Sequence, residues 1–398
     1  MKKLITFLII CTTVAILALP IAARNLIAQP AGSEPQDACS EENKDALYAA
    51  FRDKRTADQA KAYEAAKKYL ACPAPAEVTE SQKKIVDYLT KWVAAYDDAA
   101  KKAKLRTLLY NDMKYPEAYA IGKEILATEP DNLKVLIDLG ANGYLVGPLN
   151  NAMLTSQALE HAKLALSMLE SGKSLEDWQP LASRDVAVAY LNYTIGALTL
   201  ERDPSSALKY LIKAAQFETP LKKSPFTFTY IAGAYELGPY AKQSADYKAI
   251  FFGKDETPES KLALANINQL VDRIIDGYAR AVALAGSDAK FTAQKAIWNE
   301  NLTKWYKYRN NEDVAGLDSM IASILSKPLP PEPTPLTSLP ASTPAATPAG
   351  TSATPDGDSK AAGSPNSTSS TPAGTAANKT APAANAKPAS GKPDRPRN

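Results

Sequence analysis

Cys39 and Cys72 are the residues whose type and spacing most clearly permit chemistry in this sequence. Helical patterns cover about residues 40–54 and 56–71, and a tight turn between them predicts an antiparallel hairpin. The two cysteines flank this hairpin, so they should lie next to each other in space. A disulfide between them would close a loop of 33 residues and stabilise the fold by about 3 kcal/mol in the chain-entropy model. Two unpaired cysteines are the alternative.

The sequence shows no other recognisable arrangement of catalytic or metal-binding residues. The chain has one histidine, His161, and we expect it to be structural because it lies among the small residues of a helix. Neither a Ser-His-Asp arrangement nor a cluster of metal-ligating residues is recognisable. We therefore expect no catalytic, cofactor-binding or metal-binding residues. An uncharacterised envelope hydrolase remains an alternative, because two carboxylates distant in sequence can meet in the fold.

The N-terminus has the pattern of an export signal. Lys2 and Lys3 precede an uncharged, largely apolar stretch at residues 4–23, and Arg24 closes it. This predicts a signal peptide over residues 1–28, or a retained signal anchor, because the stretch is about long enough to span a bilayer. In both cases we expect an exported protein, periplasmic or extracellular, with a linker at residues 29–38.

The C-terminal part has a different composition. Fifteen of the 29 prolines follow Lys327, and large apolar residues become rare there. Such a segment buries too little apolar surface to offset the entropy of ordering. We therefore predict a disordered tail over residues 328–398, which serves as a spacer or as a tether to the cell envelope.

The middle of the chain shows helical periods and start signals. Asp203 precedes Pro204, Thr257 precedes Pro258, and Pro116 opens a third apolar stripe. Small polar caps followed by proline at the first helical position are typical of helix N-termini. We also expect Asn311 to cap the last helix. The sequence therefore predicts an all-α protein of many short-connected amphipathic helices.

A repeated pattern of small and large residues runs through these helices. One unit covers Ala99–Asn132, 34 residues, with its closing proline at Pro130. The next begins near Leu133, and the matching positions of the three units are Leu105, Leu109, Ala118, Gly122 and Ile125, then Leu139, Gly140, Ala158, Ala162 and Ala165, then Gly196, Ala207, Leu211 and Ala214. This succession resembles the tetratricopeptide repeat (TPR) family, most clearly over residues 99–220.

The resemblance implies a fold and a division of the chain. We expect a right-handed superhelical solenoid of antiparallel helix hairpins. Its expected parts are N-terminal hairpins at 39–98, TPR-like repeats at 99–256 and a helical cap at 257–327.

The resemblance also implies a ligand surface, the concave face lined by the first helix of each pair. Placed on the repeat pattern, the residues expected there are Lys134, Asp138, Tyr144, Tyr190, Asn192, Tyr193, Phe226, Thr229 and Tyr230. This mixed polar and aromatic lining suits a peptide or a partner helix.

These expectations favour a non-catalytic binding scaffold whose partner is a protein or peptide. A structural, tethering envelope protein that uses its C-terminal tail is the main alternative. The 46 basic and 43 acidic residues nearly balance, with a net charge of +3, so nothing indicates a nucleic-acid partner. Contact with a membrane is expected only through residues 1–28.

Overall fold

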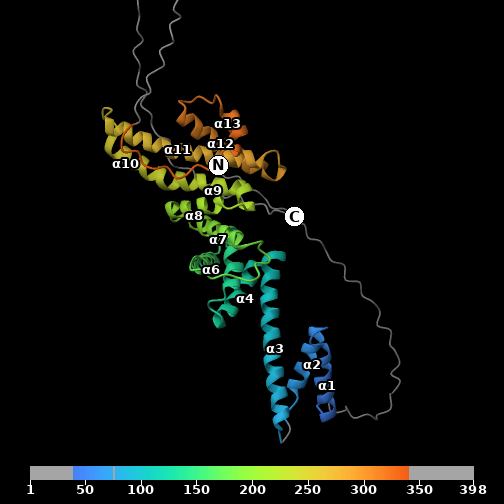
Figure 1. The fold of residues 1–398 in the computed structure, drawn as a ribbon. Helices are drawn as coiled ribbons and strands as arrows, with labels where there is room; N and C mark the ends of the chain where they lie inside the picture. The colour runs from blue at the N-terminus through green and yellow to red at the C-terminus, as the bar shows by residue number, and fades with distance from the viewer. Residues whose placement is uncertain (1–38, 75–76, 340–398) are drawn as a thin grey trace, which may run out of the picture. The chain divides into compact units, whose positions relative to one another are not determined.

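The computed structural model describes residues 39–74 and 77–339. Within these ranges the chain is helical and contains no strand (Figure 1). The prediction of an all-α protein is therefore confirmed. The predicted signal segment, the linker and most of the predicted tail lie outside the described residues.

The α-helices follow one another with short connections. In chain order they are α1 (Glu41–Lys54), α2 (Gln59–Ala71), α3 (Glu80–Arg106), α4 (Tyr115–Thr128), α5 (Leu133–Ala141), α6 (Ala152–Glu170), α7 (Arg184–Thr199), α8 (Pro204–Gln216), α9 (Pro225–Tyr235), α10 (Ala241–Phe251), α11 (Pro258–Ala285), α12 (Thr292–Arg309) and α13 (Leu317–Ser323). Single turns of π-helix at η1 (Thr107–Asn111) and η5 (Glu236–Tyr240) extend α3 and join α9 to α10.

The local start signals explain most of these boundaries. The Asp203 carboxylate accepts a hydrogen bond from the Ser206 amide at 3.0 Å, and α8 begins at Pro204. Thr257 and Ser260 form a reciprocal capping box at the start of α11. The expected cap at Asn311 is wrong, because α13 begins at Leu317. Asn311 instead lies in the turn before it with a φ of 55°.

The chain divides into two compact units between Asp97 and Asp98, within α3. In the first unit α1 and α2 form the expected hairpin. Its core consists of Phe51, Ala62, Ala65, Ala66, Tyr69 and Leu89. A disulfide joins Cys39 and Cys72, whose Cα atoms are 5.4 Å apart, across a separation of 33 residues. It ties the start of α1 to the end of α2, where the hairpin reasoning placed it.

The second unit is a succession of helix pairs. α5 packs on α6, α7 on α8 and α11 on α12, while α5 also contacts α7 and α9 contacts α11. One core cluster extends from Ala189 on α7 to Ile324 beyond α13. The segment expected to be a separate cap at 257–327 therefore shares its core with the preceding helices.

Close approach of paired helices depends on glycine. A Cβ on Gly140 would lie 2.8 Å from the Ala162 Cα of α6, and one on Gly196 would lie 2.6 Å from Leu211 of α8. A Cβ on Gly122 would lie 2.6 Å from Leu139. A glycine here, where the repeat pattern usually has a large residue, leaves room for the leucine of the following helix.

The boundary of the predicted disordered tail needs correction. Residues 328–336 lie along α11, held by hydrogen bonds from Asn266, Arg273 and Arg280. Leu329 packs against the core cluster of the second unit. Composition alone predicted disorder because the segment is rich in proline, but a proline-rich segment needs few backbone partners and these side chains supply them.

Candidate functional site

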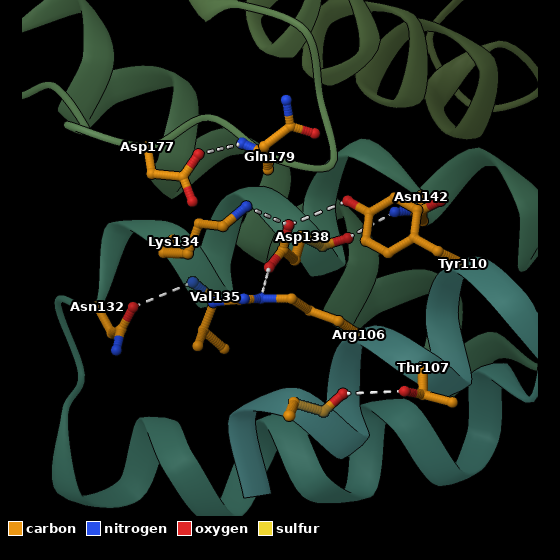
Figure 2. A network of polar contacts seen from close by, with 11 residues as sticks. Arg106, Thr107, Tyr110, Asn132, Lys134, Val135, Asp138, Asn142, Asp177 and Gln179 are labelled. Atoms are coloured by element: carbon orange, nitrogen blue, oxygen red, sulfur yellow. Dashed lines mark hydrogen bonds and ion pairs between the residues drawn. The ribbon is translucent and has the colours of Figure 1, made fainter. Parts of the chain in front are cut away.

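A buried carboxylate, Asp138 on α5, organises a polar network in the second unit (Figure 2). Its Oδ1 accepts hydrogen bonds from the Tyr110 hydroxyl at 3.0 Å and the Lys134 ammonium at 2.9 Å. Its Oδ2 lies 3.5 Å from Nε of Arg106. The Asn142 amide donates to the main-chain oxygen of Asp138 at 2.9 Å. We refer to Arg106, Tyr110, Lys134, Asp138 and Asn142 as the Asp138 network.

Burial and the neighbouring positive charge have opposite effects on the pKa of the Asp138 carboxyl. Asp138 is 1% exposed, and this burial raises the pKa of its carboxyl, while the charge of Lys134 and the hydrogen bonds act to lower it. Burial and the neighbouring carboxylate also raise the pKa of the Tyr110 phenol, which therefore acts as a hydrogen-bond donor. Two cations surround one anion, and the Arg106 side chain remains 44% exposed. The network thus presents positive charge toward solvent.

Helix geometry places these groups. Lys134, Asp138 and Asn142 follow one another at intervals of four residues, which keeps them on one side of α5 and its end. Arg106 and Tyr110 have the same spacing across the junction of α3 and η1. The five side chains therefore come from two parts of the chain, the junction of α3 with η1 and the helix α5 with its end. At the contact between Tyr110 and Asp138 these parts are 28 residues apart in sequence.

Four tyrosines form a second group, which we call the tyrosine row: Tyr144, Tyr190, Tyr193 and Tyr230. The ring centroids of Tyr144 and Tyr193 are 5.2 Å apart, those of Tyr144 and Tyr190 6.0 Å, and those of Tyr193 and Tyr230 5.8 Å. The row thereby connects the end of α5 with α7 and α9. The Tyr144 amide also donates to Oγ1 of Thr194 at 3.2 Å.

The tyrosine row is neutral and only partly covered. Burial raises the pKa of each of its phenols. Tyr193 is 4% exposed, whereas Tyr144, Tyr190 and Tyr230 are half-buried. The row therefore has a buried centre and three rings with accessible parts.

The remaining predicted partner residues are placed as follows. Lys134 is half-buried, with 15% of its side chain exposed, and is paired with Asp138. Phe226 packs toward the single turn η6 (Ala289–Phe291) and α12, its ring 6.0 Å from that of Phe291 and 5.4 Å from that of Trp298. Thr229 is half-buried and donates to the main-chain oxygen of Pro225. Phe226 and Thr229 thus add no visible feature to the tyrosine row.

The expectation that Asp138, Asn192 and Tyr193 face a partner needs correction, because all three are buried. Asn192 is 0% exposed and its amide donates to the Val188 carbonyl at 2.8 Å. The repeat pattern assigns a position on the first helix of a pair, but helices packed on both sides bury more of that surface. Asp138 instead binds the more exposed side chains of Lys134 and Arg106. Tyr193 packs against the half-buried rings of Tyr144 and Tyr230.

Three members of the Asp138 network were not foreseen from the sequence: Arg106, Tyr110 and Asn142. A signal was present, because Lys134, Asp138 and Asn142 repeat with a period of four. Arg106 and Tyr110 share this spacing, but nothing in the sequence indicates that they meet Asp138, since only tertiary packing brings the junction of α3 and η1 beside α5.

Within the described parts of the chain, no group of three or more His, Cys, Asp or Glu side chains could hold a metal ion. The helices described are also too short or too polar to cross a membrane. Comparison with known proteins found no match to any family model, curated protein or solved structure.

Proposed function

We propose that this protein is a non-catalytic, exported scaffold that binds an extended peptide or a partner helix at the tyrosine row. The observation that carries the proposal is the direct ring contact of tyrosines from three separate helical elements, namely the single turn Gly143–Leu145 after α5, α7 and α9. Sequence reasoning had selected the same four tyrosines as ligand-facing residues.

The chemistry of the row fits such a partner. Tyrosine provides a large apolar ring and a polar tip at low entropic cost, which is why it is enriched at protein interfaces. Nearby, the Asp138 network leaves the Arg106 side chain 44% exposed. A ligand with apolar side chains and an acidic or carbonyl-rich flank would match both features.

The proposed location rests on the disulfide and the N-terminal pattern. The Cys39–Cys72 bond suits an oxidising compartment. The apolar stretch within residues 1–28 would direct the chain there. The proposed repeat architecture is supported by the serial helix pairs and by their glycine contacts at Gly140 and Gly196.

The test is selection of a displayed random-peptide library against the full chain, followed by affinity measurement on individual peptides. The test variant carries Tyr144→Ser and Tyr190→Ser, which remove two accessible rings. The matched control carries Tyr210→Ser, which removes a half-buried ring on α8 outside the row. Far-UV circular dichroism checks that each variant is folded.

We expect the selected peptides to bind the wild type and the Tyr210 variant equally and to lose affinity for the Tyr144/Tyr190 variant. A shared consensus among these peptides would define the ligand class. Peptides that bind all three proteins alike, or an absence of enrichment, would argue against ligand binding at the row.

The tethering alternative is favoured by one specific observation, the attachment of residues 328–336 to α11. This attachment holds the last part of the described chain on the second unit. Truncation after Leu339 tests the role of that remainder without removing the attached segment. A tether would lose its cellular location in this truncation, whereas a scaffold would keep both its location and its peptide ligands.

A further inference from the structure

The surface of α11 that holds residues 327–336 has features of a recognition site. Asn266, Arg273 and Arg280 recur every seven residues, so they form one stripe along the helix. Each donates to a main-chain carbonyl of the segment: Asn266 to Leu336 at 3.2 Å, Arg273 to Pro331 at 2.8 Å and Arg280 to Pro328 at 2.7 Å. We call residues 327–336 the strap.

The stripe and the strap match in length. Fourteen residues of helix between Asn266 and Arg280 span about 21 Å at about 1.5 Å per residue. The eight steps from Pro328 to Leu336 span about 25 Å in a polyproline II conformation of about 3.1 Å per residue. The strap therefore runs nearly fully extended and antiparallel to α11.

The contacts from the α11 side chains go to the backbone of the strap, which is extended and has few N–H donors of its own. Five strap positions are proline and supply carbonyls without N–H groups, namely Pro328, Pro330, Pro331, Pro333 and Pro335. The Leu336 amide, which does need an acceptor, donates to Oδ1 of Asn266 at 2.6 Å. Leu329 packs against the core cluster of the second unit. The stripe thus suits an extended proline-rich segment that carries a leucine near its start.

Arg280 requires a partner at this surface. It is 5% exposed, and its Nε is paired with Asp276 at 2.7 Å. Its Nη2 donates to the carbonyls of Lys327 at 3.1 Å and Pro328 at 2.7 Å. Release of the strap would expose this side of the guanidinium and replace both acceptors by water, and binding of a proline-rich segment would restore them.

The strap itself is held mainly by these few contacts. Glu332, Thr334 and Pro335 are exposed, as are Leu325 and Ser326 just before the strap. Release at this exposed junction would leave the buried anchor Ile324 and the helices before it in place. A short polyproline-type segment also loses little entropy when it binds again, because it is already extended.

We propose that the α11 stripe is a binding surface for proline-rich segments and that it exchanges its own strap for the strap of a second copy of this chain. The pattern Leu329-Pro-Pro-x-Pro-x-Pro-Leu336 occurs once in the sequence, and no leucine follows Leu339. No other segment of the chain repeats this arrangement of a leucine followed by closely spaced prolines. Exchange of an identical segment between two copies is a low-cost route to a dimer. The inference does not depend on the tyrosine row.

The first test measures the mass of the full chain by light scattering over a range of concentrations, after release in mild urea and dialysis. We expect a dimer whose fraction rises with concentration in the wild type. The variant Leu329→Ser with Leu336→Ser should lose this dimer. Circular dichroism verifies that the variant keeps its helices. A wild type that remains monomeric throughout, or a dimer that persists in the variant, would overturn the proposal.

The second test locates the contact. One copy carries Asn266→Cys and the other Leu336→Cys, and the two are mixed under mild oxidation. Strap exchange predicts a disulfide-linked heterodimer above the background given by the wild-type chain. The matched control replaces Leu336→Cys by Ser323→Cys, at an exposed position of α13, and should stay at background. A dimer in the first test whose cross-linking does not exceed this control would show that the copies associate elsewhere.

Discussion

At the scale of single residues, Asp138 illustrates how a buried charge is kept. Removing one partner of a buried ion pair leaves the others without their counter-charge, which typically costs more than the pair contributes. Lys134 and Tyr110 both donate to the same carboxylate oxygen. The network therefore depends on that oxygen more than on either donor.

We expect Asp138→Ala to destabilise the second unit by about 3 kcal/mol, because it orphans Lys134 and the Tyr110 hydroxyl. Asp138→Asn keeps an acceptor for both donors and should cost less. Urea unfolding followed by circular dichroism measures the two effects. Equal losses in the two variants would show that the negative charge, and not the presence of an acceptor oxygen, matters at this position.

His161 gives a pH-dependent prediction. Its ring stacks on Tyr119 with centroids 6.1 Å apart, and burial lowers its pKa below the ordinary 6.5. The unfolded chain therefore takes up the proton first when the pH falls below that value. This contribution to stability is present at higher pH and is lost as the pH falls from about 6.5 toward the folded-state pKa.

Thermal unfolding at about pH 8 and about pH 5 compares the wild type with His161→Gln. The wild type should lose more stability on acidification than the variant. Carboxylates titrate in both proteins, so only the difference between them reports on His161. Identical pH dependence in the two proteins would contradict a buried, neutral imidazole.

At the scale of secondary-structure elements, Gly140 and Gly233 show that glycine has two different effects in these helices. A Cβ at Gly140 would meet the backbone of α6 at 2.8 Å, whereas one at Gly233 on α9 meets nothing within 4 Å. The first glycine serves close helix packing. The second only adds conformational freedom to a helix.

We therefore expect Gly140→Ala to destabilise the fold by about 1–3 kcal/mol through overpacking. Gly233→Ala is the matched control and should stabilise it by about 0.5–1 kcal/mol, because alanine is the better helix former. Chemical denaturation of both variants tests the pair. A neutral Gly140→Ala would mean that α5 and α6 can move apart at little cost.

At the scale of the whole molecule, the division between Asp97 and Asp98 makes the disulfide a local element of the first unit. Replacing Cys39 and Cys72 by serine should lower the stability of that unit by about 3 kcal/mol. Hydrogen exchange read by mass spectrometry should show faster exchange in α1 and α2 and unchanged exchange in α5 to α12. Faster exchange in both units alike would show that they unfold together.

Local patterns in the sequence were enough to predict the helical class, the start of α8 at Pro204 and of α11 at Pro258, and the pairing of Cys39 with Cys72. These features depend on residues near one another in the chain, where caps, prolines and periodicity act directly. The sequence also selected the four residues of the tyrosine row from a repeat pattern.

Which of these residues are exposed, and which distant segments meet, depends on tertiary packing and could not be predicted from the sequence. Asn192 is buried because helices pack on both sides of α7. Arg106 joins Asp138 because the end of α3 lies beside α5. The strap lies on α11 because Asn266, Arg273 and Arg280 supply donors that composition cannot reveal. Burial and long-range hydrogen bonding depend on the packing of elements far apart in sequence, and a single sequence carries no local signal for it.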